Sequence, residues 1–332
     1  MNAILTPGVW VSWVLLFGRD WRSLLRIVIA GGIGVGVFVA LWPWLYHDTA
    51  NRLLYYFLMA SRFKNRPQFY LGQTAGHVAW HYPFVVTLAV VPLIITVMYL
   101  LGILRVVRRK PSDRVGWLLL FNALLPLMLA ATPFQAAYSG ERHFIPAYPY
   151  LACLAGVGFG GALNTLSSAG QRFYDRVSRR TMRLMLTCAL VLLLVPPLLS
   201  IARIHPYELS YYSELVGGLP GAARLGLETT FWCEAYQDAL PYLNDNAASG
   251  AFVWAENPFV LRFYQREGRL REDLEVIGGD VVSPYEADYV VAEMRQTGFS
   301  YPPEIVDVMR EQKPVHTLAY QGVVLLHVYK IP

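Results

Sequence analysis

The stretch LMLTCALVLLLVPPLLSIAR, residues 184–203, decides the predicted fold. An apolar helix of about 20 residues crosses the roughly 30 Å hydrocarbon core of a bilayer, and Pro196 and Pro197 should kink it. Other windows share this composition, namely 27–46, 83–104, 115–133, 144–163 and the shorter 3–18. The sequence therefore predicts an α-helical polytopic membrane domain over residues 1–203, with about six spans.

Charge divides the chain at the end of the last window. Residues 1–203 hold 19 Lys and Arg and five Asp and Glu, whereas residues 204–332 hold nine and 18. Such a split indicates two physical environments, so the overall pI of about 9.0 does not indicate nucleic-acid binding. The three cysteines, at 153, 188 and 233, form no metal-binding pattern. We expect no nucleic-acid partner, no metal and no cofactor.

The positive charge also predicts an orientation. Most of it lies in three short loops: Arg19, Arg22 and Arg26; Arg105, Arg108, Arg109, Lys110 and Arg114; and Arg172, Arg176, Arg179, Arg180 and Arg183. Loops rich in Lys and Arg stay in the cytoplasm. Loops 47–82 and 134–143, and residues 204–332, are then extracytoplasmic in a multi-pass protein of the cell inner (plasma) membrane. This orientation places the N-terminus outside, so we expect the chain to be the C-terminal part of a longer protein. The alternative is a six-span protein whose short N-terminus is translocated.

Residues 204–332 are polar enough to form a soluble extracytoplasmic domain. Its pattern predicts helices over 235–244, 258–266 and 302–310, strands over 251–255, 274–277 and 288–292, and a closing hairpin of 315–320 and 323–330. Alternating helices and strands imply a small α/β domain. Glu228, Trp232 and Glu234 lie close together in the sequence, and Glu256 and Asp288 end predicted strands. Acids at such positions can be catalytic, but a capping or solvated role is favoured. Acceptor binding or a lid is the favoured role for this domain.

Loop 47–82 contains basic residues on the predicted extracytoplasmic side. Arg62, Lys64 and Arg66 could bind an anionic ligand such as a lipid-linked phosphate, or could anchor the chain at the interface. The segment 51–63 is amphipathic and suits the membrane surface. The polar and aromatic residues that follow are candidates for a substrate cavity: Tyr70, Gln73, His77, His81 and Tyr82.

The second such loop ends on Glu141, Arg142 and His143, directly before a predicted span. Placing ionisable residues beside hydrocarbon costs free energy, so such residues are usually paired or functional. Arg142 and His143 could bind phosphate with Glu141 orienting them, or Glu141 and Arg142 could pair and close the loop. In the predicted orientation, Asp48 and Glu141 are the two acids of residues 1–203 that face outward, which makes them the candidates for a general base. The catalytic residues are otherwise unknown.

Three segments of the chain resemble one enzyme family. They are residues 42–48 with 70–73 and 80–83, residues 141–149, and residues 205–218 with 226–232. Together they are similar to the C-terminal portion of the polyprenyl-phosphate-sugar-dependent glycosyltransferases of the GT-C fold, which include the protein O-mannosyltransferases and the lipid A aminoarabinose transferases. The similarity covers essentially the whole chain.

The resemblance implies an inverting transfer from a polyprenyl-phosphate-linked sugar to a protein, lipid A or glycan acceptor. A carboxylate would deprotonate the acceptor, and Arg142 and His143 would neutralise the leaving phosphate. The acidic pair that the family carries in its first extracytoplasmic loop has no match in this chain. One alternative is therefore a non-catalytic membrane remnant or scaffold partner of a transferase. A transporter or flippase is less favoured, since its ionisable residues would lie within the spans.

Overall fold

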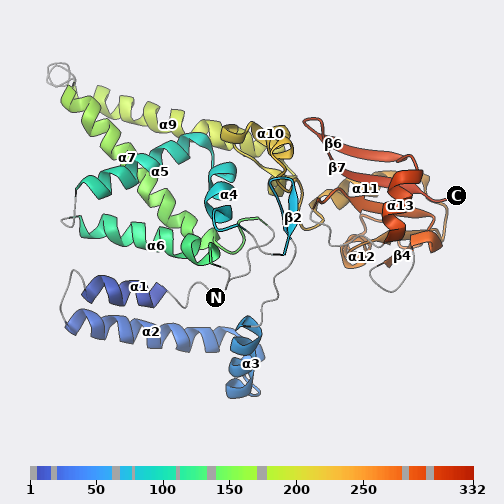
Figure 1. Ribbon diagram of the computed structural model, residues 1–332, viewed down its shortest axis with the longest axis horizontal. Helices are drawn as coiled ribbons and strands as arrows, with labels where there is room; N and C mark the ends of the chain where they lie inside the picture. The colour runs from blue at the N-terminus through green and yellow to red at the C-terminus, as the bar shows by residue number, and fades with distance from the viewer. Residues whose placement is uncertain are drawn as a thin grey trace. The chain divides into compact units, whose positions relative to one another are not determined.

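The computed structural model describes residues 6–15, 21–61, 68–76, 79–109, 113–132, 140–169, 178–278, 284–296 and 303–332 (Figure 1). The chain divides into two compact units. The N-terminal unit comprises Met1–Arg66 and His77–Leu193, and the C-terminal unit comprises Pro67–Gly76 and Leu194–Pro332. The C-terminal unit therefore includes a short segment, Pro67–Gly76, that interrupts the N-terminal unit in the sequence. The predicted division at residue 203 did not include this segment.

Helices make up the N-terminal unit. They are α1 (Thr6–Trp13), α2 (Trp21–Leu41), α3 (Thr49–Ser61), α4 (Tyr82–Val90), α5 (Leu93–Arg108), α6 (Arg114–Ala130), α7 (Tyr148–Ala169) and the first part of α9 (Arg179–Ile204). Short 3-10 helices, Pro43–Leu45 and Ile145–Ala147, precede α3 and α7. Asp113 begins α6, since its carboxylate accepts the backbone N–H of Gly116 at 2.9 Å.

Glycines set the close packing of α5 on α7. A Cβ atom on Gly102 would lie 1.9 Å from the Leu154 carbonyl oxygen, and one on Gly158 would lie 1.9 Å from the Met98 carbonyl oxygen. Neither position admits a side chain, so the two backbones touch directly. Leu154 and Val106 are fully buried nearby. The apolar residues of these helices thus form a helix–helix core.

The predicted polytopic membrane domain with six spans is wrong. Among the described residues, two helices are long and apolar enough to cross a membrane, Trp21–Leu41 and Arg180–Ile204. They account for the windows 27–46 and 184–203. The windows 3–18, 83–104, 115–133 and 144–163 do not pass the same test.

Each of those four windows fails for a physical reason. Window 83–104 breaks at Pro92 into a nine-residue α4 and a 16-residue α5, and window 115–133 gives a 17-residue α6 with Pro126 inside it. Window 3–18 gives the eight-residue α1 within the described residues. Window 144–163 begins in a 3-10 helix, and α7 is diluted by glycines and polar residues. Hydrophobic composition does not distinguish a lipid-facing helix from one that is packed against its neighbours.

An aromatic cluster follows the end of α2. Trp42 contacts Phe38, Trp44 and Tyr56 with ring centroids 5.1 to 5.4 Å apart. The Arg52 guanidinium lies 5.1 Å from the centroid of the Trp44 ring and donates to the Trp44 carbonyl oxygen. Helix α3 turns away from α2 at this corner (Figure 1). Its exposed side chains include Leu54 and Leu58, as expected for the amphipathic segment predicted over 51–63.

The C-terminal unit contains a five-stranded mixed sheet with the order β4-β3-β5-β7-β6. The strands are β3 (Phe252–Ala255), β4 (Glu275–Gly278), β5 (Tyr289–Glu293), β6 (His316–Tyr320) and β7 (Val323–Lys330). Strand β3 pairs in parallel with β4 and β5, whereas β7 pairs antiparallel with β5 and β6. The helices are α10 (Gly218–Arg224), α11 (Ala239–Asn246), α12 (Pro258–Arg266) and α13 (Pro303–Glu311). The predicted strands and the helices over 258–266 and 302–310 are confirmed, with ends shifted by a residue or two. The predicted helix over 235–244 is confirmed in part, since a 3-10 helix (Glu234–Asp238) precedes α11.

The core of the sheet surrounds β5, whose residues are all buried. Ile305 and Val308 of α13 pack against Trp254 and Val290 in one cluster. The predicted closing hairpin turns at Gln321 and Gly322, both with positive φ. Burial of this apolar surface is the main stabilising contribution in the unit.

A two-stranded hairpin from the middle of the chain completes this unit. Strands β1 (Gln68–Tyr70) and β2 (Gln73–Ala75) pair antiparallel, and Tyr70 forms a bridge with Leu227. The Gly72 N–H donates to the Gly226 carbonyl at 3.0 Å. Gly226 has a φ of +71°, and a Cβ there would meet the Gly72 nitrogen at 2.1 Å. The contact requires glycine at position 226.

Candidate functional site

The predicted Glu141–Arg142–His143 segment forms an ordered turn that leads into α7. The backbone N–H of Phe144 donates to the Glu141 carbonyl at 2.9 Å, and the Phe144 side chain is fully buried. Tyr82, at the start of α4, donates its hydroxyl to the Gly140 carbonyl at 3.3 Å. Its ring meets the Phe144 ring edge-on at 6.2 Å between centroids. The structure therefore brings Tyr82 to this turn, which sequence separation alone could not establish.

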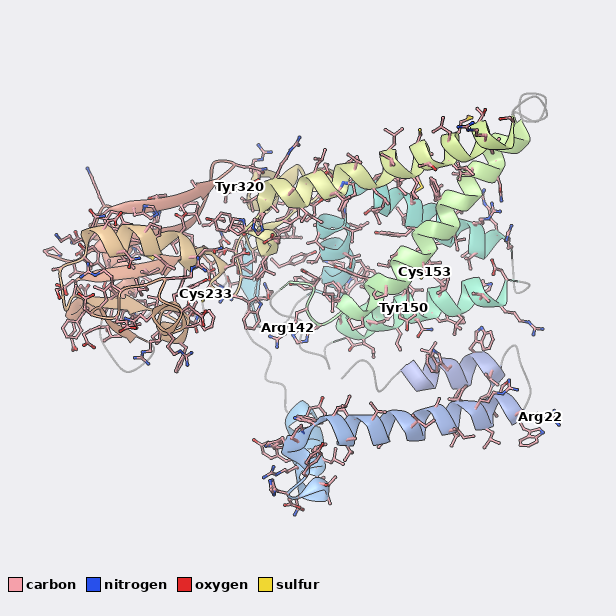
Figure 2. All side chains as sticks on the ribbon, turned by 180° about the vertical axis from the view of Figure 1, so that it is seen from behind. Arg22, Arg142, Tyr150, Cys153, Cys233 and Tyr320 are labelled. Carbon is pink, nitrogen blue, oxygen red and sulfur yellow. The ribbon has the colours of Figure 1, made fainter. Side chains whose placement is uncertain are left out.

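The three ionisable side chains of the turn lie in different environments. Arg142 is exposed, whereas Glu141 and His143 are half-buried. Burial raises the pKa of Glu141 above its ordinary value. Burial, together with the positive charge of Arg142, lowers the pKa of His143. The arrangement offers a permanent cation to solvent, beside a neutral imidazole and a carboxyl group that holds its proton more tightly than usual. Figure 2 shows Arg142 near the start of α7.

Two of the remaining predicted residues have other contacts in the structure. Asp48 is exposed, and its carboxylate accepts the side-chain amide of Asn51 at 3.0 Å before α3. His81 precedes α4, with its ring 5.6 Å from that of Trp80. Arg62, Lys64, Arg66 and His77 lie outside the described residues.

The predicted substrate cavity is divided between the two units. Tyr70 and Gln73 belong to the hairpin of the C-terminal unit, whereas His81 and Tyr82 belong to the N-terminal unit. Tyr70 is buried, which raises the pKa of its hydroxyl to about 12, and Gln73 is exposed. Tyr70 therefore has the environment of a structural residue that holds the hairpin in place.

A second group of polar residues lies at the carboxyl ends of β3 and β5. The chain passes from β3 to β4 on one side and then to β5 on the other, which creates a topological switch point. Ligands of open α/β sheets bind at such points. The group comprises Glu228, Thr229, Thr230, Cys233, Asn257, Glu293 and Gln296.

The hydrogen bonds of this group are directed inward. Glu293, fully buried, accepts the Thr230 hydroxyl at 2.9 Å and the Cys233 N–H at 3.3 Å. Glu228 accepts the Gln296 N–H at 2.5 Å. The pKa of Glu293 is raised to about 7, and burial is the main cause. The Thr230 hydrogen bond and the Arg295 charge act in the opposite direction and limit the rise. Both buried carboxylates thus have partners, and the group fastens segment 226–234 to the sheet.

These hydrogen bonds stabilise an unusual backbone conformation at residues 232 and 233. Trp232 and Cys233 both have a φ of 60°, a left-handed conformation that non-glycine residues rarely adopt. Burial raises the pKa of the Cys233 thiol to about 12, so it is no thiolate nucleophile. The sequence indicated Glu228, Trp232 and Glu234 by their proximity. It gave no signal for Glu293, whose partner Thr230 is 63 residues away in the chain.

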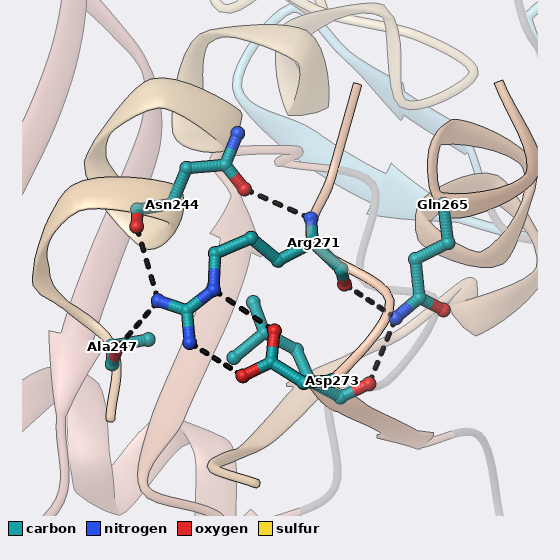
Figure 3. A network of polar contacts seen from close by, with 6 residues as sticks. Asn244, Ala247, Gln265, Arg271 and Asp273 are labelled. Carbon is teal, nitrogen blue, oxygen red and sulfur yellow. Dashed lines mark hydrogen bonds and ion pairs between the residues drawn. The ribbon is translucent and has the colours of Figure 1, made fainter. Parts of the chain in front are cut away.

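A further polar network, around Arg271, is structural. Its guanidinium donates to the carbonyls of Asn244 and Ala247, at 3.1 and 2.8 Å, and to the Asp273 carboxylate at 2.9 and 2.6 Å (Figure 3). Gln265 donates to the carbonyls of Arg271 and Leu274. The Arg271 hydrogen bonds hold the pKa of Asp273 well below its usual range. These bonds satisfy the end of α11 and the connection to β4.

The turn at Glu141–His143 is therefore the best candidate for chemistry on an anionic substrate. It combines an exposed cation with two half-buried ionisable groups, and Tyr82 and Phe144 fix its backbone. Among the described residues, no group of His, Cys, Asp and Glu is arranged to hold a metal ion. No family model, curated protein or solved structure matches the chain.

Proposed function

We propose that the chain is a membrane glycosyltransferase, or the C-terminal part of one, that uses a polyprenyl-phosphate-linked sugar. The observation that carries the proposal is the exposed Arg142 on a turn whose backbone Tyr82 and Phe144 fix. A guanidinium binds a phosphate with two parallel hydrogen bonds, and its charge does not depend on pH. The resemblance of residues 141–149 to the glycosyltransferase family supports the same assignment.

The roles of the three side chains follow from their environments. Arg142 neutralises the charge that grows on the phosphate as the anomeric C–O bond breaks. His143, whose pKa is lowered, acts as a neutral hydrogen-bond donor to the same oxygens. Glu141 accepts the proton of the acceptor hydroxyl, and its raised pKa improves its match to a base that works near neutral pH. The acceptor oxygen bonds to the anomeric carbon, and polyprenyl phosphate leaves.

The membrane location rests on the two long apolar helices. Arg179, Arg180 and Arg183 begin α9, and the positive-inside tendency places that end in the cytoplasm. Residues after Ile204, and hence the sheet of the C-terminal unit, then lie on the extracytoplasmic side of the plasma (inner) membrane. The aromatic cluster after α2 is typical of a membrane–water interface, which supports insertion of α2 in the bilayer. The acceptor is a protein, lipid A or glycan on that outer side.

A non-catalytic partner of another transferase is the second candidate. The buried carboxylates of the C-terminal unit have their hydrogen-bond partners inside the protein, which favours a structural role for that unit. The family's acidic loop pair is also not matched in the chain. Under this alternative the turn at Arg142 binds the donor phosphate without catalysing transfer.

Transfer from a radiolabelled polyprenyl-phosphate sugar, with the full chain in nanodiscs, tests the proposal. Replacing Arg142 by Ala should lower kcat/KM roughly 100-fold, on the order of the loss of one charge-stabilising donor, and Lys should restore part of it. Arg310→Ala, which removes an exposed arginine of α13, is the control and should leave the rate unchanged. Full activity of Arg142→Ala refutes the assigned role. Binding of the donor without transfer selects the non-catalytic alternative.

A further inference from the structure

A cavity with a volume of about 630 Å³ lies between α5 and α7. This volume falls within the range of roughly 300–1,000 Å³ that small-molecule sites occupy. The lining residues are Leu101, Leu104, Arg105, Arg108 and Arg109 from α5, and Gly158, Gly161, Ala162 and Thr165 from α7. The three arginines form a cationic part of the wall, and apart from Thr165 the other lining residues are apolar or glycine.

Gly161 leaves room in the cavity wall for the side chain of Arg105. A Cβ on Gly161 would lie 2.9 Å from the Cδ and Nη1 atoms of Arg105. The Arg105 side chain therefore lies across Gly161 and is half-buried. The direct backbone contact at Gly158 holds the two helices at the spacing that the cavity requires. The packing of α5 on α7 thus determines where the Arg105 guanidinium lies.

The positive charge of this wall is not balanced within the described residues. Asp113 lies 4.0 Å from Arg109, which forms the ion pair of this region. No carboxylate of the described residues pairs with Arg105 or Arg108. Both arginines lie in the last turn of α5, where the helix dipole offsets part of their charge. Two neighbouring arginines repel each other, so an anion bound between them beside the apolar surface would be stabilised.

We propose that this cavity binds an anionic phospholipid. The phosphate accepts hydrogen bonds from Arg105 and Arg108, and an acyl chain lies along Leu101, Leu104 and Ala162. A free phosphate would leave the apolar wall unused, whereas an amphiphile matches both parts of the lining. Two helices of the chain are long and apolar enough to cross a membrane, so bilayer lipid is the nearest source of such a molecule.

The site is distinct from the proposed donor site. Helix α7 begins at Tyr148, next to the Arg142 turn, whereas the cavity residues of α7 are Gly158 to Thr165. At about 1.5 Å per residue, these positions lie roughly 15–25 Å further along the helix. The proposal does not depend on sugar transfer, and its test measures binding alone.

The test uses the full chain, delipidated and held in amphipol. Phosphatidylglycerol, phosphatidylcholine with the same acyl chains, and inorganic phosphate are compared by native mass spectrometry and by thermal shift. We expect retention of one phosphatidylglycerol with a raised Tm, at least tenfold weaker retention of phosphatidylcholine, and no shift with millimolar phosphate. Equal retention of the two lipids, or an equal shift with inorganic phosphate, overturns the proposal.

Variants locate the binding. The double variant Arg105→Gln/Arg108→Gln should weaken retention of phosphatidylglycerol at least tenfold. Arg114→Gln, which removes an exposed arginine outside the cavity lining, should retain the lipid as the wild type does. Because Arg105 packs on Gly161, loss of fold in the double variant would obscure the result. Ala162→Trp fills the cavity at unchanged charge and should also abolish retention. Full retention in Ala162→Trp refutes the assigned cavity.

Discussion

The stability of the C-terminal unit should fall as pH rises from about 4.5 to about 7. Burial raises the pKa of Glu234 to about 7 and so contributes to this fall, and Glu293 contributes a separate part of it. Its carboxyl is fully buried at the end of β5, and burial raises its pKa from 4.5 to about 7. The unfolded chain releases this proton near pH 4.5, whereas the folded unit holds it until about pH 7. Between these values the folded state binds more protons, so stability decreases with pH.

The magnitude follows from the shift of the pKa. Each unit corresponds to 1.36 kcal/mol, so the shift at Glu293 amounts to roughly 3 kcal/mol over the whole window. For a unit of this size, 1 kcal/mol moves Tm by about 2–4 °C, which gives roughly 6–12 °C in all. Replacement by Gln keeps the shape of the side chain but removes its ionisation. The variant should gain stability relative to wild type as pH rises.

Thermal unfolding of the full chain, followed by limited proteolysis and mass spectrometry of peptides from the C-terminal unit, measures this at pH 5 and pH 8. The Tm of Glu293→Gln minus that of the wild type should rise between the two values. A general effect of pH on the N-terminal unit cancels in this difference. Glu267→Gln, an exposed carboxyl after α12, is the control and should show a constant difference. A constant difference for Glu293→Gln as well would refute the assigned burial cost.

Three further predictions have defined outcomes, and two of them have a matched control substitution. Gly226→Ala should destabilise the C-terminal unit by about 2 kcal/mol or more and increase hydrogen exchange in the β1–β2 hairpin, because the new methyl meets backbone at 2.1 Å. Gly250→Ala, with a φ of +78° in open space, should cost only about 1 kcal/mol. Gly158→Ala should lower the Tm of the N-terminal unit, whereas Gly156→Ala, with no atom within 4 Å of its Cβ, should not. Tyr82→Phe removes one hydrogen bond, worth about 1 kcal/mol, and should lower donor affinity without loss of fold; donor affinity equal to wild type would show that Tyr82 does not position the turn.

The local elements of the C-terminal unit could be predicted from the sequence because short-range signals define them. Helix α12 begins at Pro258, a residue that favours the first helical turn, and Leu261 is buried at the apolar spacing. The hairpin of β6 and β7 turns at Gln321 and Gly322, where φ is positive. Such features need no knowledge of distant partners.

Two features that the sequence did not predict depend on distant contacts. Strand β1 joins the C-terminal unit through a bridge from Tyr70 to Leu227, which no local pattern encodes. Glu293 ends an apolar strand and resembles a solvated cap until its bond to Thr230 is known. The count of spans was wrong because several apolar windows form helices too short to cross a bilayer, such as the nine-residue α4 and the 16-residue α5, and composition does not reveal where those helices end in the fold.

The Glu141–His143 turn was predicted from its residue types and its place next to an apolar helix. Its backbone was not predicted, since the contact of Tyr82 with Gly140 spans 58 residues. The protonation states of Glu141 and His143 could not be predicted from the sequence either, because they depend on burial. Burial acts in opposite directions on the pKa values of Glu141 and His143 and makes both neutral forms easier to populate.

The assignment of Arg142 to the donor phosphate is the central claim. A polyprenyl-phosphate sugar with a photoreactive diazirine beside its phosphate tests it most directly, after cross-linking to the full chain in nanodiscs and peptide mapping. We predict cross-links within residues 140–150 that excess unlabelled donor prevents and that Arg142→Ala reduces at least tenfold. Specific cross-links confined to the cavity around Arg105 and Arg108, or to the C-terminal unit, would contradict the account.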